Sequence, residues 1–314
     1  MKPVAICLVL AAVAGCAISP DSSSENAQDS SATQYVNIED FGTIDQGAWF
    51  DAIGKLNGEF AALCPSTFCA TGAYSTYTPL TFYCSVSSKE GSVKDCAWTF
   101  AASNAAVDAT TAAIQFDVPT FQCHIHPKTT ATKLVALLEG STDAIHEVLP
   151  STTSIADSLA TCFANPIGST PLTAATSASP TYVDAIDYYT TTANRAKWTA
   201  SYAELQSGFD NVCGDTFCSS DYADLWSMQL ACAVTKSTGN IKACTWAFAG
   251  SFTTVATSGE LALTSKSWQC PVAVKGTISQ MIAALTSTTD TNDGVHRVLP
   301  GGIDAYDSIA GCLP

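Results

Sequence analysis

The sequence predicts an α+β protein made by tandem duplication of one disulfide-rich unit. Each unit is expected to be a helix packed on a three-stranded antiparallel sheet, followed by two short helices. Three observations predict this class. A repeat runs from Tyr35 to the C-terminus, each copy carries a matched set of cysteines, and the hydrophobic period changes from helical to strand-like at the same place in both copies.

The repeat is clearest where "LCPSTFC" at residues 63–69 recurs as "VCGDTFC" at residues 212–218. Longer stretches match as well, and the alignment needs only small shifts. "KDCAWTFAAS" at Lys94 recurs at Lys242 as "KACTWAFAGS", and "IHEVLP" at Ile145 recurs at Val295 as "VHRVLP". The sequence therefore predicts repeat 1 at residues 35–163, a Pro/Ser/Thr-rich linker at 164–181 and repeat 2 at 182–314.

Helical spacing of apolar residues predicts that each copy opens with an amphipathic helix. The apolar residues are Trp49, Ile53, Leu56, Phe60 and Leu63 in the first copy, and Trp198, Tyr202, Leu205, Phe209 and Val212 in the second. Alternation at residues 80–86 and 96–100 then predicts a hairpin, with Trp98 and its counterpart Trp246 in the core.

A third strand is expected to end at residues 121–125, and Pro119 interrupts its alternation, which indicates a bulge or a sheet edge. Apolar residues around Leu134–Leu138 and at Ile155, Leu159 and Cys162 predict the two short helices that complete the unit.

Twelve of the 14 cysteines lie outside the N-terminal segment and form two matched sets of six. They are Cys64, Cys69, Cys84, Cys96, Cys123 and Cys162, matched by Cys213, Cys218, Cys232, Cys244, Cys270 and Cys312. Even, repeated sets behind a signal peptide predict three disulfides per copy. Zinc is the alternative, but the usual CxxC pairs are missing.

Six cysteines allow 15 pairings, and the spacing favours one of them. A hairpin would set Cys84 opposite Cys96, and Cys123 would tie the third strand to Cys162 in the last helix. The two remaining cysteines of the copy would then close their own short loop.

The N-terminus, "MKPVAICLVLAAVAGC", has one lysine and an apolar run that suits a signal peptide. "VAGC" at Val13–Cys16 is similar to a bacterial lipobox, which implies cleavage before Cys16 and lipidation of its thiol. The alternative is an ordinary secretory signal. The Ser-rich, acidic segment at residues 17–34 reads as a tether. We therefore expect export and a lipid anchor in the bacterial cell envelope, or else secretion.

The chain carries a net charge of -15, with 28 acidic residues against 13 Lys and Arg. Such a charge repels phosphate backbones, so nucleic acid is not an expected partner. The expected partners are the membrane, through the lipid anchor, and an unidentified envelope or extracellular ligand. No cofactor is expected.

The stretches "VCGDTFCSSDYADL" and "CTWAFAGS" in the second copy resemble uncharacterised cysteine-rich repeat proteins of myxobacterial envelopes. The first copy departs from this pattern, because it has no acidic residue where the second has Asp215. The resemblance implies secretion and a tandem architecture, and it implies no activity.

Metal ligands are the first type of candidate site. His124 and His126 would point to one face of a strand, with His146 as a possible third ligand. The alternative, which the second copy favours with "CPVAV" at this place, is a polar pair on a wet sheet face.

Acidic residues near Cys218 are a second candidate for a metal site. Asp215, Asp221 and Asp224 could hold calcium through their carboxylates, although the spacing is not that of an EF-hand. A solvated acidic loop is the alternative, and we expect no resident metal at either place.

His146 and His296 are matched between the copies and are the candidates for a general base. No GxSxG or HExxH motif accompanies them, so the favoured interpretation is a pair of histidines that hold their loops.

Four aromatic residues, Tyr74, Tyr77, Tyr222 and Trp226, are expected in the loop before the first strand of each copy. Exposed aromatic side chains there could bind a glycan or a protein, and the alternative is that they fold back on the core.

The sequence thus favours a non-enzymatic, lipid-anchored protein with a binding or structural role. An extracytoplasmic hydrolase and a secreted protease inhibitor are the other hypotheses.

Overall fold

The computed structural model describes residues 34–67, 74, 76–170, 172, 177, 179–214, 216–218, 222, 224–290 and 292–314. Residues Thr33–Pro314 form one compact unit. The predicted signal peptide, the lipidated Cys16 and nearly all of the tether lie outside the described residues. Cys69, Asp215 and Asp221 also lie outside them.

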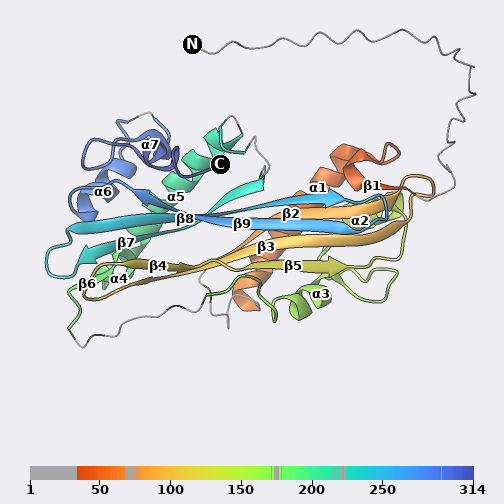
Figure 1. Ribbon diagram of the computed structural model, residues 1–314, viewed down its shortest axis with the longest axis horizontal. Coiled ribbons are helices and arrows are strands. Elements are labelled where there is room, and N and C mark those ends of the chain that lie inside the picture. Colours follow the sequence, from red (N-terminus) through yellow and green to blue (C-terminus); the bar gives the residue numbers. More distant parts are fainter. Residues whose placement is uncertain are drawn as a thin grey trace, which may run out of the picture. The chain divides into compact units, whose positions relative to one another are not determined.

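The first half of the described chain, residues 34–170, holds five strands and three α-helices, with two short 3-10 helices (Figure 1). In chain order they are β1 (Tyr35–Asn37), η1 (Ile38–Asp40), α1 (Gln46–Leu63), η2 (Cys64–Ser66), β2 (Thr76–Ser87), β3 (Val93–Val107), β4 (Ile114–Asp117), β5 (Thr120–Ile125), α2 (Ala131–Gly140) and α3 (Ile155–Cys162).

The second half, residues 179–314, follows nearly the same order. Its elements are β6 (Tyr182–Asp184), α4 (Ala185–Tyr188), α5 (Thr192–Cys213), β7 (Asp224–Thr235), β8 (Ile241–Val255), β9 (Leu261–Val272), α6 (Ile278–Leu285), η3 (Gly294–His296) and α7 (Ala305–Ile309). No helix among the described residues is both long enough and apolar enough to cross a bilayer.

Each half contains one antiparallel sheet, so the chain is a mixed α/β protein, as predicted. The first sheet has the order β1-β2-β3-β4, with β5 also paired to β3, and the second has the order β6-β7-β8-β9. The prediction of three strands per sheet was wrong, because β1 and β6 each add a short edge strand before the helix. Three residues are too few to show an alternating pattern.

The predicted third strand of the first half is interrupted before Pro119, where β4 ends at Asp117 and β5 begins at Thr120. β5 lies at the sheet edge, as the proline indicated. In the second half, β9 runs without interruption.

The two central hairpins have the same register. Cys84 lies opposite Cys96 in β2 and β3, and Cys232 lies opposite Cys244 in β7 and β8. The register slips beside Leu80 in one hairpin, between Pro79 and Thr81, and beside Met228 in the other, between Ser227 and Gln229. Such irregularities bend a strand and redirect its side chains, so the two hairpins bend at corresponding places.

Five disulfides lie among the described residues. They are Cys84–Cys96, Cys123–Cys162, Cys213–Cys218, Cys232–Cys244 and Cys270–Cys312. The first two confirm the pairing that the sequence favoured for a cross-strand link and for a link between the third strand and the last helix. The pairing of Cys64 with Cys69 lies outside the described residues.

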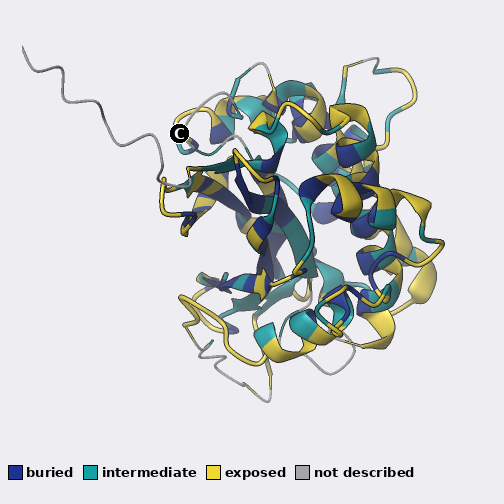
Figure 2. Ribbon diagram, turned by 90° about the vertical axis from the view of Figure 1, so that its right-hand side faces the viewer, coloured by how far each residue is buried: buried dark blue, intermediate teal, exposed yellow. Residues whose placement is uncertain are grey.

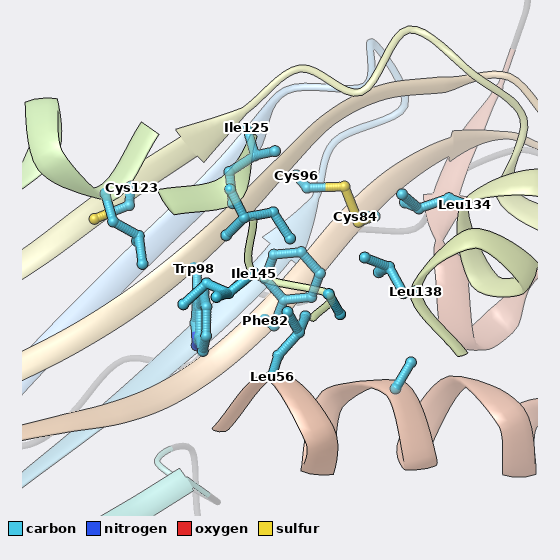
Figure 3. Close-up of a cluster of buried hydrophobic side chains, with 14 of the residues drawn as sticks. Leu56, Phe82, Cys84, Cys96, Trp98, Cys123, Ile125, Leu134, Leu138 and Ile145 are labelled. Atoms are coloured by element: carbon cyan, nitrogen blue, oxygen red, sulfur yellow. A yellow bond between two sulfur atoms is a disulfide. The ribbon is translucent and has the colours of Figure 1, made fainter. Parts of the chain in front are cut away.

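The core of the first half lies between its sheet and helices α1, α2 and α3 (Figure 3). From α1, Trp49, Leu56 and Phe60 are fully buried, which confirms the predicted helical stripe at these positions. Phe60 packs on Trp98 with ring centroids 5.9 Å apart. Trp98 is buried, as is Trp246 in the matching core of the second half, so the prediction for both tryptophans is confirmed.

The faces of the two sheets that point away from the helices pack against each other. A cluster of buried, mostly small residues joins them, made of Leu80, Ala101, Phe116, Met228, Ala231, Ala247 and Ala249. The Thr81 and Ser251 hydroxyls bond at 2.9 Å, and the Ser103 hydroxyl donates to the Gln229 side chain at 3.1 Å. The central strands are thus buried on both faces, whereas the helices keep an exposed side (Figure 2).

Candidate functional site

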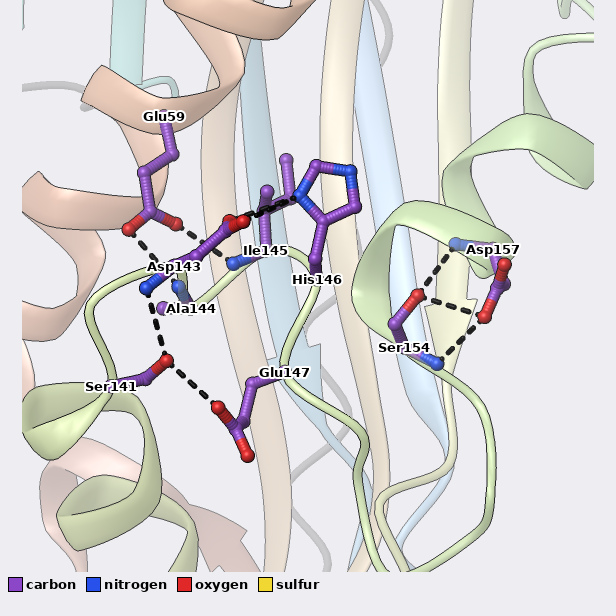
Figure 4. A network of polar contacts seen from close by, with 9 residues as sticks. All are labelled: Glu59, Ser141, Asp143, Ala144, Ile145, His146, Glu147, Ser154 and Asp157. Carbon is purple, nitrogen blue, oxygen red and sulfur yellow. Dashed lines mark hydrogen bonds and ion pairs between the residues drawn. The ribbon is translucent and has the colours of Figure 1, made fainter.

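His146 lies in the loop between α2 and α3, and neighbouring carboxylates hold that loop in place (Figure 4). The His146 Nδ1 atom lies 2.9 Å from Asp143 Oδ1. From α1, the Glu59 carboxylate accepts hydrogen bonds from the backbone N–H groups of Ala144 at 3.0 Å and Ile145 at 2.7 Å. Glu59 therefore satisfies two backbone donors that would otherwise be unpaired.

A cavity of about 370 Å³ opens beside His146. It is lined by Glu59, Ala62, Leu63, Ser66, Thr142, Asp143, Ile145 and His146. Asp143 orients the imidazole as a general base requires, and Ser66 is a hydroxyl in the same cavity. However, the Ser66 hydroxyl donates to the Leu63 carbonyl at 3.1 Å, and no described hydrogen bond joins it to His146.

His296, the matched histidine of the second half, has different neighbours. Its ring packs on Tyr306 with centroids 4.6 Å apart, and its Nδ1 atom lies 3.8 Å from Asp304 Oδ2. Its backbone N–H donates to the Asp293 side chain at 3.2 Å. Both histidines therefore have contacts typical of residues that hold a loop.

His124 lies on β5 and His126 directly follows this strand, and the imidazoles of both reach Asp95 on β3. The Nδ1 atoms lie 2.7 Å and 3.0 Å from the two Asp95 oxygens. The hydrogen bond to Asp95 raises the pKa of His124, and desolvation opposes this effect. Asp95 was not among the predicted site residues, although its place next to Cys96 on a strand puts it on the opposite, histidine-bearing face.

The proposed third ligand, His146, bonds Asp143, and the described structure shows no contact between it and this pair. Among the described residues, no group of three or more His, Cys, Asp or Glu side chains could hold a metal ion. Each of the two histidines instead contacts one oxygen of the Asp95 carboxylate.

Of the three predicted calcium ligands, only Asp224 is described, and it begins β7 instead of lying in a loop. Desolvation raises its pKa to about 6, and the negative charge of Glu39 adds to the shift. Desolvation likewise raises the pKa of Tyr83, on β2, to about 12, with the charge of Asp224 as a further cause. Asp224 thus belongs to a contact between the two halves.

Tyr74 and Tyr77 fold back on the core. The Tyr74 hydroxyl donates to Asp117 at 3.1 Å, and the Tyr77 ring meets Phe163 edge-on at 5.5 Å. Tyr77 lies within β2, so its assignment to a loop was wrong. These contacts favour the packing role for the first-half pair.

In the second half, Tyr222 packs edge-on against Trp268 with ring centroids 5.1 Å apart. Trp226 lies within β7 and not in a loop, but 39% of its surface is exposed. It is therefore the predicted aromatic residue that remains available to a partner.

The fold also forms cavities that the sequence did not predict, and two of them are described next. One, of about 560 Å³, lies between α5 and α6 and is lined by Tyr189, Asn194, Lys197, Ala200, Ser279, Ile282, Ala283 and Thr286. The other, of about 410 Å³, lies beside β5 and is lined by Gln122, His124, Ser158, Thr161, Cys162, Asn165 and Ile167. Both are lined by residues that come together only in the fold, so no local motif marks them.

No family model, no curated protein and no solved structure matches this chain.

Proposed function

We propose that this chain is a non-enzymatic protein of the cell envelope, exported and lipid-anchored through Cys16, with a binding or structural role. Its two units arose by tandem duplication. One observation carries the proposal: the buried frame matches between the halves, whereas outward-facing positions differ. A fixed scaffold that varies its surface is typical of proteins whose function is binding at that surface.

The duplication is supported by the contacts between the halves. Cys232 lies 148 positions after Cys84, and the same offset relates Gln229 to Thr81 and Ser251 to Ser103. The bond between Thr81 and Ser251 thus corresponds to the bond between Gln229 and Ser103, with the halves exchanged. Such reciprocal contacts are typical of an interface between two copies related by a two-fold axis.

The divergence of the surface is clearest beside the first long helix of each half. The cavity between α5 and α6 presents Tyr189 and Lys197, where the matching first-half positions are Gly42 and Ala48. The tyrosine and the lysine of this groove thus have no counterpart at the matching positions of the first half. The two halves therefore offer different surfaces to partners.

Export is supported by the disulfides, because such bonds persist in oxidising compartments. The lipobox supports the anchor. The test is mass spectrometry of protein purified from its native envelope without reductant. We expect a diacylated Cys16 and no free thiol among the twelve repeat cysteines. An unmodified N-terminus would contradict the anchor, and free thiols would contradict the full set of disulfides.

A hydrolase is the second candidate, favoured by the cavity that holds Ser66, Asp143 and His146 together. A serine nucleophile activated by His146 would react with a fluorophosphonate probe. We expect no labelling of the purified chain. Labelling of Ser66 that is lost in Ser66→Ala would favour the hydrolase and contradict the non-enzymatic proposal.

A further inference from the structure

We propose that the open edge of β5 is a docking site for an extended peptide segment of a partner protein, which adds to the first sheet as an antiparallel strand. The inference rests on the binding function proposed above and names the site and the partner's chemistry. Peptides that bind in this way gain affinity from main-chain hydrogen bonds to an unpaired strand.

β5 has a neighbouring strand on only one side. It pairs with β3, where Ile125 lies opposite Cys96 and Cys123 lies opposite Trp98. On its other side, the described contact is one isolated bridge, in which Thr120 and Ile167 exchange backbone hydrogen bonds of 2.9 Å and 2.8 Å. The remainder of that edge has no strand beside it in the described structure.

The bridge at Thr120 fixes which backbone groups point outward. In an antiparallel strand, alternate residues direct their N–H and C=O groups to opposite edges. Because Thr120 bonds Ile167 on the outer edge, Gln122 and His124 also direct their backbone groups outward. No backbone hydrogen bond in the described structure reaches them from that side. Unpaired groups of this kind are a template for another strand.

The space beside this edge is hollow. The cavity of about 410 Å³ has Gln122 and His124 of β5 on one side and Ser158, Thr161 and Cys162 of α3 on the other. Ile167 closes one end, and its antiparallel bridge shows the orientation that an added strand would take.

The second half differs from the first at the position that matches His124, where its edge strand β9 lacks a backbone donor. Pro271 of β9 lies opposite Thr245 at the place where His124 lies opposite Ala97. Proline has no backbone N–H to offer, and it protects edge strands from pairing. The Gln122 side chain also donates to the Leu263 carbonyl of β9 at 3.3 Å.

The walls of the cavity define the peptide that fits. Apart from Cys162 and Ile167, the residues that line the cavity have polar side chains. Ser158 and Thr161 carry hydroxyls, Asn165 and Gln122 carry amides, and His124 carries an imidazole. His124 is already paired with Asp95, which leaves no strong charge to select a partner. Recognition therefore rests on the main chain, and the side chains that face α3 are expected to be short and polar.

The test uses a displayed library of random octapeptides, selected on the full chain. The variant His124→Pro copies Pro271 and removes the outward N–H at the centre of the edge. His124→Ala is the control, because it removes the same imidazole and keeps the N–H. We expect selected peptides to bind the wild type and His124→Ala alike and to bind His124→Pro at least tenfold more weakly. Unchanged thermal unfolding of His124→Pro would show that the variant is folded.

Amide hydrogen exchange supplies the second measurement. A bound peptide is expected to slow exchange at Gln122 and His124 in the wild type. Peptides that bind all three proteins equally would overturn the edge site while leaving a binding function elsewhere on the surface. A library that yields no binding peptide would overturn the edge site as well. The non-enzymatic proposal has a separate test, because only labelling of Ser66 by the fluorophosphonate probe would contradict it.

Discussion

At the scale of single residues, the two halves carry different side chains at the end of their first strands, an amide in one and a carboxyl group in the other. Asn37 ends β1 and lies opposite Ser85, and Asp184 ends β6 and lies opposite Ala233. Burial raises the pKa of Asp184 to about 6, although backbone hydrogen bonds, the largest from Cys232, oppose the shift. The first half thus has a neutral amide where the second half buries a carboxyl group.

Replacing Asp184 by Asn is expected to stabilise the protein at neutral pH. Because the folded pKa is raised from 3.8 to about 6, the folded state binds a proton more tightly than the unfolded state. Asp184 therefore lowers stability as pH rises from about 4 to about 6. Thermal unfolding across this range should show a smaller decline for Asp184→Asn. Glu260→Gln, at an exposed position of the second half, is the control, and equal profiles for wild type and Asp184→Asn would contradict the assignment.

Glu59 and Gly208 occupy matching positions, and each lies where the long helix of its half contacts a loop. The two contacts are made in different ways. The Glu59 carboxylate bonds the N–H groups of Ala144 and Ile145. At Gly208 the loop comes so close that an added Cβ would lie 2.4 Å from the backbone nitrogen of Val295. A side chain bridges the helix and the loop in one half, and direct backbone contact replaces it in the other.

Glu59→Ala is expected to lower the free energy of unfolding by about 1–3 kcal/mol, because it leaves two loop N–H groups without their acceptor. Glu59→Gln keeps one acceptor oxygen and should lose less. Asp51→Ala, on the exposed side of the same helix, is the matched control and should change stability little. Urea unfolding measures all three variants. A loss for Asp51→Ala equal to that for Glu59→Ala would argue against the bridge.

At the scale of elements, the C-terminal ends of α2 and α6 are each met by a cation that comes from a different element. Lys55 of α1 donates to the Leu138 and Glu139 carbonyls at the end of α2. Its counterpart on α5 is Glu204, which pairs at 3.1 Å with Arg297, and Arg297 donates to the Leu285 carbonyl of α6. The long helix carries a cation in the first half and an anion in the second. In both halves, however, a cation contacts the C-terminal end of the short helix, α2 or α6, and neutralises its partial negative charge.

Arg297→Met is expected to lower stability by about 1–2 kcal/mol, since it removes hydrogen bonds to the Leu285 and Asn292 carbonyls and the pair with Glu204. The Arg297 side chain is only 13% exposed, so solvent screens these contacts weakly. Arg195→Met removes a half-exposed arginine and is the control. Chemical unfolding should separate the two variants, and equal stabilities would contradict a role for Arg297 at the helix end.

Most of the helices and strands could be predicted from the sequence. Long periodic segments predicted α1, α5 and the central hairpins, and cysteine spacing predicted the cross-strand disulfide between Cys84 and Cys96. β1 and β6 were missed because three residues carry no period. Asp95 was missed as the partner of His124, since the pairing of neighbouring strands brings them together and no local motif marks it. Likewise, the opening beside β5 depends on where Ile167 returns to the sheet.

At the scale of the whole molecule, the packing of one sheet against the other was not foreseeable from periodicity. Ala, Ser and Thr alternate with the large core residues of β3 and β8, which is the pattern of a strand with one solvated face. In the structure, Thr99 and Ala101 of β3 and Ala247 and Ala249 of β8 are buried. Small side chains let the two sheets approach closely. The fold therefore buries the Ala, Ser and Thr face of these strands, which the composition suggested was exposed to solvent.

This close approach predicts that the two halves lose stability together when their shared cluster is overfilled. Ala249→Leu adds volume where Ala249 packs in a cluster with Leu80 and Ala101 of the other half, and overpacking of a dense site costs about 1–3 kcal/mol. Ala262→Leu, at an exposed position of β9, is the matched control and should cost little.

Urea unfolding followed by tryptophan fluorescence reports on both halves at once, through Trp49 and Trp98 in one core and Trp246 in the other. We expect a single transition for the wild type, moved to lower urea by Ala249→Leu and almost unchanged by Ala262→Leu. Equal midpoints for the two leucine variants would mean that the sheet contact contributes little. In that case the disulfides and the separate cores would account for the stability of each half, and the back-to-back contact would only orient the two halves.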